Sequence, residues 1–174
     1  ETGLGQPKAN DLYKFIFEDS YSALSAEAKR ALWAIAAIDN PAVADQVCYV
    51  AELAPGEFER VLDELIGTSL VAFDHLSGRY TILEITHEYV VALMSRELER
   101  WARRAVDWES RVRYERLDET AKEAMQLLAK TDRPVPIPTL VRWLGGIGSN
   151  ILSNLVTSLQ EAGLAVYDEA LQMI

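Results

Sequence analysis

The side chains best suited to chemistry in this chain are two histidines and one cysteine, and they are scattered. His75 and His87 lie on either side of a predicted hairpin and belong to no Cys–x–x–Cys or His–Glu–x–x–His pattern that binds zinc. We expect His75 beside a turn, exposed, and His87 on a helix surface. Cys48 lies between Val47 and Tyr49, which indicates a small buried apolar group. These spacings predict no catalytic, metal-binding or cofactor-binding site.

A glycine-rich run, Gly145-Gly146-Ile147-Gly148-Ser149, precedes a predicted helix. Glycines before a helix N-terminus can cradle phosphate with backbone N–H groups. No strand is predicted before this run and no lysine follows it, as the phosphate-binding loop of nucleotide hydrolases requires. The alternative, a flexible turn between two helices, is therefore the prediction.

Four tryptophans are candidates for an interface: Trp33, Trp101, Trp108 and Trp143. An amphipathic aromatic side chain that finds no core partner is a common interface anchor, whereas packing in the core or between domains is the alternative for each of them. Trp33 is the best candidate because it lies off the apolar stripe of its predicted helix.

The elements that must position these residues follow from apolar periodicity and from turn residues. Leu12, Phe15, Ile16 and Phe17 begin a short amphipathic helix, and Ser25 caps the next, which ends at Asp39-Asn40-Pro41. The remaining prediction comprises helices over 43–53, 58–66, 118–130, 138–144 and 149–162, strands over 70–73 and 80–83 that form a hairpin, and a strand over 164–167.

The order of these elements is duplicated. Leu24-Ser25-Ala26-Glu27-Ala28-Lys29 recurs 93 positions later as Leu117-Asp118-Glu119-Thr120-Ala121-Lys122, and the offset becomes 94 at Asp74 and Asp168. Three helices followed by a hairpin are the parts of a winged helix, a helix-turn-helix domain with a β wing. The predicted fold class is mainly α with small β-hairpin wings, as tandem winged-helix domains joined by a long helix. The predicted boundaries are a tail or linker over 1–10, domains over 11–96 and 117–174, the second with a truncated wing, and a connecting helix over 97–116.

Apolar residues at steps of three and four extend along 86–116, which predicts an amphipathic helix leading from one copy to the other. Its other face is nearly neutral, so a solvated face with i,i+4 pairs is favoured over a basic binding stripe. The charged residues are Arg100, Arg103, Arg104, Arg111, Arg113 and Arg116 with Glu97, Glu99, Asp107, Glu109 and Glu115.

Composition excludes several classes of function. The 174 residues carry a net charge of −10, which opposes binding to nucleic acid or to an anionic membrane unless cations gather on one face. No apolar run reaches the roughly 18 residues of a membrane span, so we expect a cytoplasmic protein. The missing initiator methionine and an end in mid-pattern suggest a piece of a longer protein.

DNA reading by a winged helix requires cations or amides on its third helix. In the first copy that helix carries Glu57, Glu59, Asp63 and Glu64 against Arg60, and in the second the segment 149–162 has no lysine or arginine. A DNA-binding tandem winged-helix transcriptional regulator, which would use Asn150, Asn154 and connector arginines, remains an alternative that salt-dependent DNA binding would reveal.

Six short runs carry a resemblance to a known family, namely Leu12-Tyr13-Lys14-Phe15-Ile16-Phe17, Ser20–Ser25, Ala28–Leu32, Ser69-Leu70-Val71, Arg79-Tyr80 and His87-Glu88-Tyr89. Together they resemble the winged-helix domain of STAND signalling ATPases of the NB-ARC type. The resemblance implies a non-catalytic, regulatory region of a larger, bacterial signalling or defence ATPase. Its partners would be an upstream nucleotide-binding domain of the same chain and a downstream sensor region. The family's Met-His-Asp signature, whose histidine contacts the nucleotide phosphate, aligns with Ile82-Leu83-Glu84, and leucine cannot donate a hydrogen bond.

A third possibility is an architectural adaptor similar to the acidic tandem winged-helix partners of bacterial condensins. That interpretation predicts a protein-bound helix and no upstream ATPase.

Overall fold

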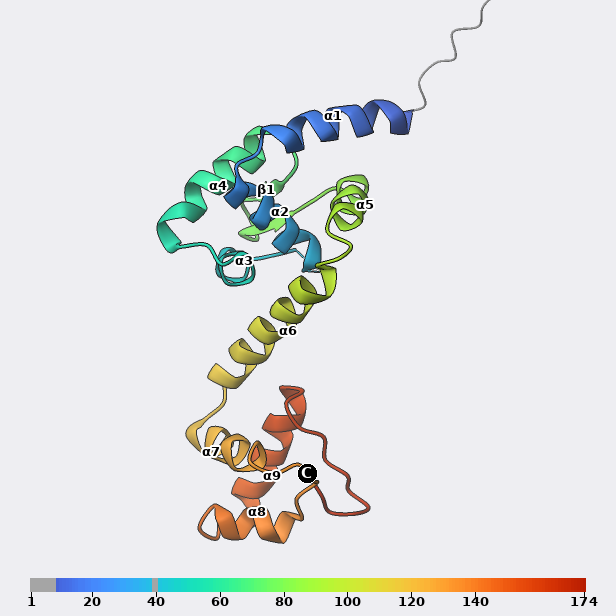
Figure 1. The fold of residues 1–174 in the computed structure, drawn as a ribbon. Coiled ribbons are helices and arrows are strands. Elements are labelled where there is room, and N and C mark those ends of the chain that lie inside the picture. Colours follow the sequence, from blue (N-terminus) through green and yellow to red (C-terminus); the bar gives the residue numbers. More distant parts are fainter. Residues whose placement is uncertain (1–8, 39–40) are drawn as a thin grey trace, which may run out of the picture. The chain divides into compact units, whose positions relative to one another are not determined.

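Helices dominate the computed structural model, which describes residues 9–38 and 41–174 (Figure 1). Over these residues it contains nine helices and one two-stranded antiparallel sheet. The predicted class, mainly α with a small β-hairpin, is confirmed at this level. The chain divides into two units, Glu1–Trp108 and Glu109–Ile174, here called unit 1 and unit 2.

Unit 1 is built around a central helix that is rich in alanine. Ser25 accepts a hydrogen bond from the Ala28 amide at 3.2 Å and begins this helix, as predicted. Ala28, Ala31 and Leu32 are fully buried, and small side chains let neighbouring helices approach closely. The elements of unit 1 are α1 (Ala9–Ala23), α2 (Ala26–Ala37), α3 (Ala44–Ala51), α4 (Pro55–Gly67), β1 (Ala72–Asp74), β2 (Arg79–Thr81), α5 (Glu84–Leu93) and the first part of α6 (Leu98–Glu115).

The hairpin of unit 1 pairs β1 with β2 in the register Ala72–Thr81, Phe73–Tyr80 and Asp74–Arg79. Ala42 adds a third short segment, because its amide and carbonyl both bond to the backbone of Tyr80, at 2.9 and 2.8 Å. Both strands are shorter than predicted. Leu70 and Val71, placed in the first strand by the sequence, are buried before it begins.

The predicted continuous helix over 86–116 is wrong. The chain forms α5 and α6 with a turn over 94–97, where the Glu97 amide bonds to the Met94 carbonyl at 2.7 Å. Apolar residues keep helical spacing across this turn, and neither proline nor glycine marks it, so periodicity could not reveal the break. Met94 is buried at the end of α5, while Trp101 and Ala105 of α6 pack in the same core of unit 1.

Unit 2 contains the rest of α6, then α7 (Glu119–Leu128), α8 (Ile137–Trp143) and α9 (Ser149–Glu161). The predicted strand over 164–167 is not formed, because the following segment provides only single-residue pairings. Met173 bridges Asp168 and Pro136. The core comprises Leu117, Ala121, Ala124, Val135, Leu140, Leu155 and Leu159.

The duplication extends to local geometry inside each unit. Asp118 accepts a bond from the Ala121 amide at 2.8 Å, as Ser25 does in unit 1. Helices α4 and α9 both have 13 residues and begin 94 positions apart. Each is followed by a residue with positive φ, Ser69 at 59° and Gly163 at 63°. These three local features therefore recur in both units.

Candidate interaction surfaces

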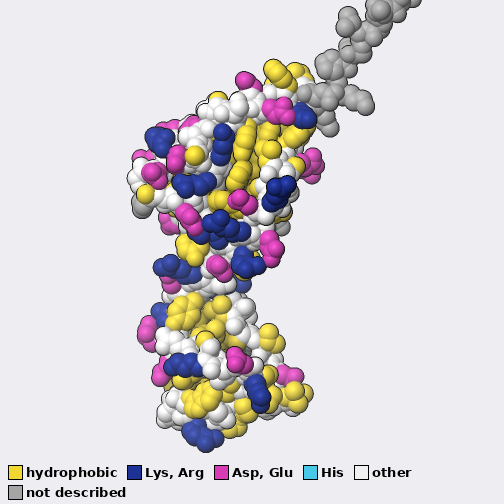
Figure 2. Space-filling view, viewed as in Figure 1, with side chains coloured by type: hydrophobic (Ala, Val, Ile, Leu, Met, Phe, Trp, Pro, Cys, Tyr) yellow, Lys and Arg dark blue, Asp and Glu magenta, His cyan; other side chains and the backbone are white. Residues whose placement is uncertain are grey.

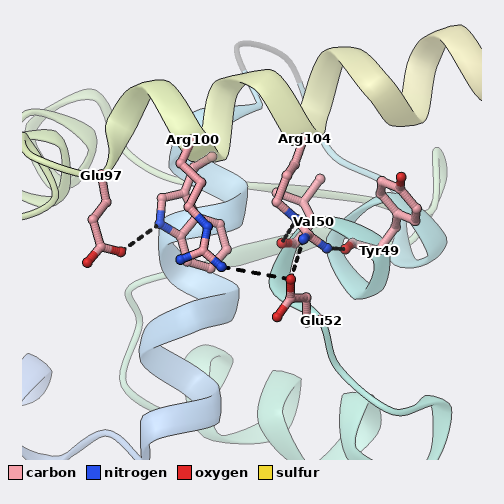
Figure 3. A network of polar contacts seen from close by, with 7 residues as sticks. Tyr49, Val50, Glu52, Glu97, Arg100 and Arg104 are labelled. Atoms are coloured by element: carbon pink, nitrogen blue, oxygen red, sulfur yellow. Dashed lines mark hydrogen bonds and ion pairs between the residues drawn. The ribbon is translucent and has the colours of Figure 1, made fainter.

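Trp101 of α6 occupies the core of unit 1. Its side chain is only 7% exposed, and its ring meets that of Trp33 edge-on at a centroid distance of 6.0 Å. Its indole N–H donates to Glu97 Oε2 at 3.4 Å (Figure 3). Trp33 is half-buried and packs against the same core. Both rings therefore find partners within unit 1, including the one that lies off the apolar stripe of its helix.

Arg104 fixes α6 to the end of α3 (Figure 3). Its guanidinium donates from Nε to the Val50 carbonyl at 3.0 Å and from Nη2 to the Tyr49 carbonyl at 2.7 Å, and it pairs with Glu52 through Nη1. The last carbonyls of a helix lack intrahelical donors and lie at its negative end, where a cation is favourable. Arg100 lies 4.0 Å from Glu52 and completes the cluster. No local pattern predicts this contact, because Arg104 lies 54 and 55 positions after the two residues whose carbonyls it binds.

Several other charged residues of α6 form i,i+4 pairs along the helix, as predicted. Arg103 pairs with Glu99 at 2.9 Å in unit 1, and Arg113 pairs with Glu109 at 3.3 Å in unit 2. Both are exposed i,i+4 pairs, which contribute little free energy. This face of α6 is a solvated one with alternating charge.

The exposed charged side chains of α4 and α9 are mostly acidic. On α4, Glu59 and Asp63 are exposed beside Arg60, while Glu64 accepts bonds from the Ser25 amide and hydroxyl at 2.5 and 2.8 Å. On α9, exposed positions are filled by amides, hydroxyls and an apolar residue, namely Asn150, Ile151, Ser153, Asn154, Thr157 and Gln160, with Glu161 at its end. Arg60 is the one exposed cation among the described positions of α4, and α9 has no lysine or arginine, so neither helix offers the group of cations that phosphate contacts require.

An exposed apolar patch lies on the first half of α1. Leu12, Phe15 and Ile16 are 54%, 69% and 51% exposed. Their spacing of three and four places them on one side of the helix, whereas Tyr13 and Phe17 stack on Tyr89 of α5. In Figure 2, hydrophobic side chains also gather on the face of unit 1 below α1, with charges of both signs around them. We name Leu12, Phe15 and Ile16 the α1 patch.

The spacing of Leu12, Phe15, Ile16 and Phe17 predicts a short amphipathic helix, but it does not predict the α1 patch. Two apolar stripes run along α1. Only the stripe that continues at i+4 steps through Tyr13 and Phe17 faces the core. The second stripe was visible in the spacing, but nothing local says which stripe is covered.

The structure places the histidines differently from one another. His75 is exposed beside the hairpin turn, as predicted. The expectation that His87 lies on a helix surface is wrong, because its ring is partly buried and donates from Nε2 to the Ala36 carbonyl at 2.9 Å. This bond places the His87 ring against the C-terminal end of α2. His87 also lines, with Ile82 and Glu84, a cavity of about 270 Å³.

Cys48 and the glycine-rich turn are the remaining candidates from the sequence, and they do not form a site with other reactive side chains among the described residues. Cys48 is half-buried, and burial raises the pKa of its thiol, with the nearby Asp45 charge as a smaller cause. Gly145 and Gly146 adopt positive φ in an exposed turn, as expected of glycine in a loop between helices. Within residues 9–38 and 41–174, no group of three or more potential ligands gathers for a metal ion.

The last two tryptophans lie near helix ends. Trp108 is half-buried in the last position of unit 1. Trp143 ends α8 in unit 2 and is 42% exposed, so among the four tryptophans it has the most open ring. None of the helices that the structure describes is long and apolar enough to cross a bilayer.

Comparison with known proteins found no match: no family model, no curated protein and no solved structure resembles the chain at a significant level.

Proposed function

We propose that this chain is a non-catalytic regulatory and protein-interaction region of a larger STAND-like signalling or defence ATPase, and that its two units are winged helices. The order α2, α3, α4 and hairpin, with Ala42 as a third short strand, supports this assignment for unit 1. The order α7, α8, α9 and the Met173 bridges support it for unit 2. The region would transmit the nucleotide state to sensor or effector parts through domain packing.

The observation that carries the protein-interaction part is the surface chemistry of α4 and α9. These are the helices that would enter the major groove in a DNA-reading winged helix. Glu59 and Asp63 are exposed on α4, and α9 contains no lysine or arginine. The acidic surface of α4 repels phosphate, and the neutral surface of α9 does not attract it, so protein partners are favoured over DNA.

The α1 patch supplies an apolar contact surface in the same proposal. Three neighbouring apolar side chains, each more than half exposed, are the kind of anchor that buries in a protein interface. Helix α1 precedes the other elements of unit 1, which makes it the element nearest in sequence to an upstream nucleotide-binding domain. We assign the patch to that contact.

Nucleotide sensing by a hydrogen bond at Leu83 is not part of the proposal. Leu83 caps α5 and its side chain is 60% exposed, but it has no donor for a phosphate. The only imidazole near it in sequence, His87, bonds to the Ala36 carbonyl. The proposed unit 1 therefore responds to the nucleotide through packing contacts.

The first test is the reading frame upstream of Glu1. A strand followed by a glycine-rich loop that ends in Gly-Lys-Ser/Thr is the expected finding, and its absence contradicts the ATPase assignment. In the intact parent, Phe15→Ser should change the rate of nucleotide release. Leu76→Ser, which alters an exposed leucine at the hairpin turn, is the matched control and should not.

A second test separates the DNA-binding alternative. The affinity for a labelled DNA duplex can be measured by fluorescence anisotropy at several salt concentrations. We expect no salt-dependent binding to the duplex between about 50 and about 200 mM salt. A steep loss of affinity over this range would instead establish phosphate contacts and favour a DNA regulator.

A further inference from the structure

A groove in unit 2 lies between α9 and the turn over 167–172. Its volume is about 490 Å³, within the range of ligand-binding clefts. Its apolar wall includes Leu152 and Val156 of α9 and Ile137 of α8, and the ring of Tyr167 lines it from the turn. Ile137 and Val156 are buried, yet neither belongs to the core cluster of the unit.

The positions of unit 1 that correspond to this groove by the 94-residue offset hold three aromatic rings. Phe58 of α4 is 7% exposed and meets Tyr80 edge-on at 5.8 Å. Phe73 stacks on Tyr80 from the other strand at 4.6 Å. The rings pack α4 against the hairpin and leave this part of unit 1 occupied by its own side chains.

The positions 94 residues later hold smaller side chains. Leu152 corresponds to Phe58 and Ile174 to Tyr80, while Tyr167 keeps the ring of Phe73. Two of the three rings are therefore replaced by aliphatic groups. Leu152 and Tyr167 line the groove, whereas Ile174 lines another cavity of unit 2, so no side chain takes the place of the Tyr80 ring between them. In unit 1 the ring of Tyr80 packs against Phe73, whose counterpart in unit 2 is Tyr167. An aromatic ring from a ligand could pack against Tyr167 in the same way.

The charged residues that line the groove limit the kind of ligand that it can bind. Glu169 is the only charged residue among those that line the groove, and it is exposed. The acidic positions Glu59 and Asp63 of unit 1 correspond to the neutral Ser153 and Thr157 on its rim. The groove thus combines an apolar floor, hydroxyl groups and a single negative charge, which complements an aromatic group next to a cation.

We propose that this groove binds a peptide segment of a protein partner, with an aromatic side chain seated between Leu152 and Tyr167 and an adjacent lysine or arginine paired with Glu169. Peptide recognition in general uses such pockets for one or two anchoring side chains. The proposal goes beyond the regulatory function above, and it can succeed or fail independently of the ATPase assignment because it concerns unit 2 within the present chain.

The test is an NMR titration of the 174-residue chain with N-acetyl-phenylalanyl-lysine amide. Saturable shifts are expected at the amides of Ser153, Thr157 and Gln172, with a Kd on the order of millimolar, as suits a ligand of this size. N-acetyl-alanyl-lysine amide should give no saturable shift at these amides. Equal shifts with both dipeptides, or saturation at other residues only, would overturn the proposal.

Two variants make the test specific. Leu152→Phe restores the side chain of unit 1 and should weaken dipeptide binding at least tenfold, whereas Ile151→Phe adds the same ring one position away, outside the groove, and should leave it unchanged. Glu169→Gln should weaken binding of N-acetyl-phenylalanyl-lysine amide severalfold and leave binding of N-acetyl-phenylalanine amide unchanged. This comparison applies even if Leu152→Phe disturbs the fold of unit 2. Unchanged affinity in Leu152→Phe with a native spectrum, or in Glu169→Gln, contradicts the assignment.

Discussion

Replacing Arg104 with alanine removes the only side chain that the structure shows joining α6 to the backbone end of α3. Two hydrogen bonds from a charged donor are lost, to the carbonyls of Tyr49 and Val50. Such bonds contribute about 1.5–3 kcal/mol each when buried. The Arg104 side chain is 27% exposed, so water can replace part of this interaction, and the exposed pair with Glu52 adds little. We expect a loss of about 2 kcal/mol, or about 10 °C in Tm for a unit of this size.

The assay must report on unit 1 alone. In a Trp143→Phe background the remaining indoles, Trp33, Trp101 and Trp108, all belong to unit 1, so tryptophan fluorescence during urea denaturation follows its unfolding. Arg104→Lys should show an intermediate loss, because an ammonium keeps the charge but not the planar fork that spans two carbonyls.

Arg103→Ala is the matched control, one residue away on the same helix. The Arg103 side chain is 72% exposed and pairs only within α6 among the contacts described, so its loss should cost about 0.3 kcal/mol. If Arg104→Ala and Arg103→Ala destabilise unit 1 equally, α6 is not held by the α3 carbonyls and the reasoning is refuted.

Other predictions concern single residues. Ser69→Gly should stabilise unit 1 by about 1 kcal/mol, because Ser69 has φ 59°, where glycine is less strained than serine. Gly163→Ser should destabilise unit 2 by at least as much, since a Cβ there would also lie 3.3 Å from Arg113 Nη1. Urea denaturation measures both changes. Asp118→Ala should cost unit 2 about 1 kcal/mol through loss of the α7 cap, whereas Asp118→Asn should retain most of it, as circular dichroism melts can show. Cys48 should react with iodoacetamide at pH 8 more slowly in the folded chain than in urea, because its raised pKa keeps the thiol protonated until a higher pH; equal rates would contradict this.

Local signals in the sequence predicted much of the helical framework. Ser25 and Asp118 are caps whose side chains compete for the first free amides of a helix, so their role depends only on nearby residues. The duplication was visible for the same reason, since caps, buried alanines and turn residues recur at fixed offsets. Boundaries were less certain where one apolar pattern continues through a turn, as it does between α5 and α6.

Candidate surfaces could be predicted only in part. The acidic character of α4 was evident from composition. The open groove of unit 2 depends on how rings from separate elements meet, and Phe58 and Tyr80 are 22 positions apart in the chain. The burial of His87 likewise depends on α2, whose Ala36 carbonyl accepts its proton.

The repeated segments, the helix starts, the turn residues and the acidity of the chain can be read from the amino-acid sequence alone, because each depends on contacts within a few residues or on composition. Packing between distant elements selects which stripe of α1 is covered, brings Arg104 to the end of α3, and leaves a groove in unit 2 at positions whose counterparts in unit 1 are aromatic. These features depend on side chains brought together from distant elements, and the free energy of burying or exposing them is set only when those elements pack.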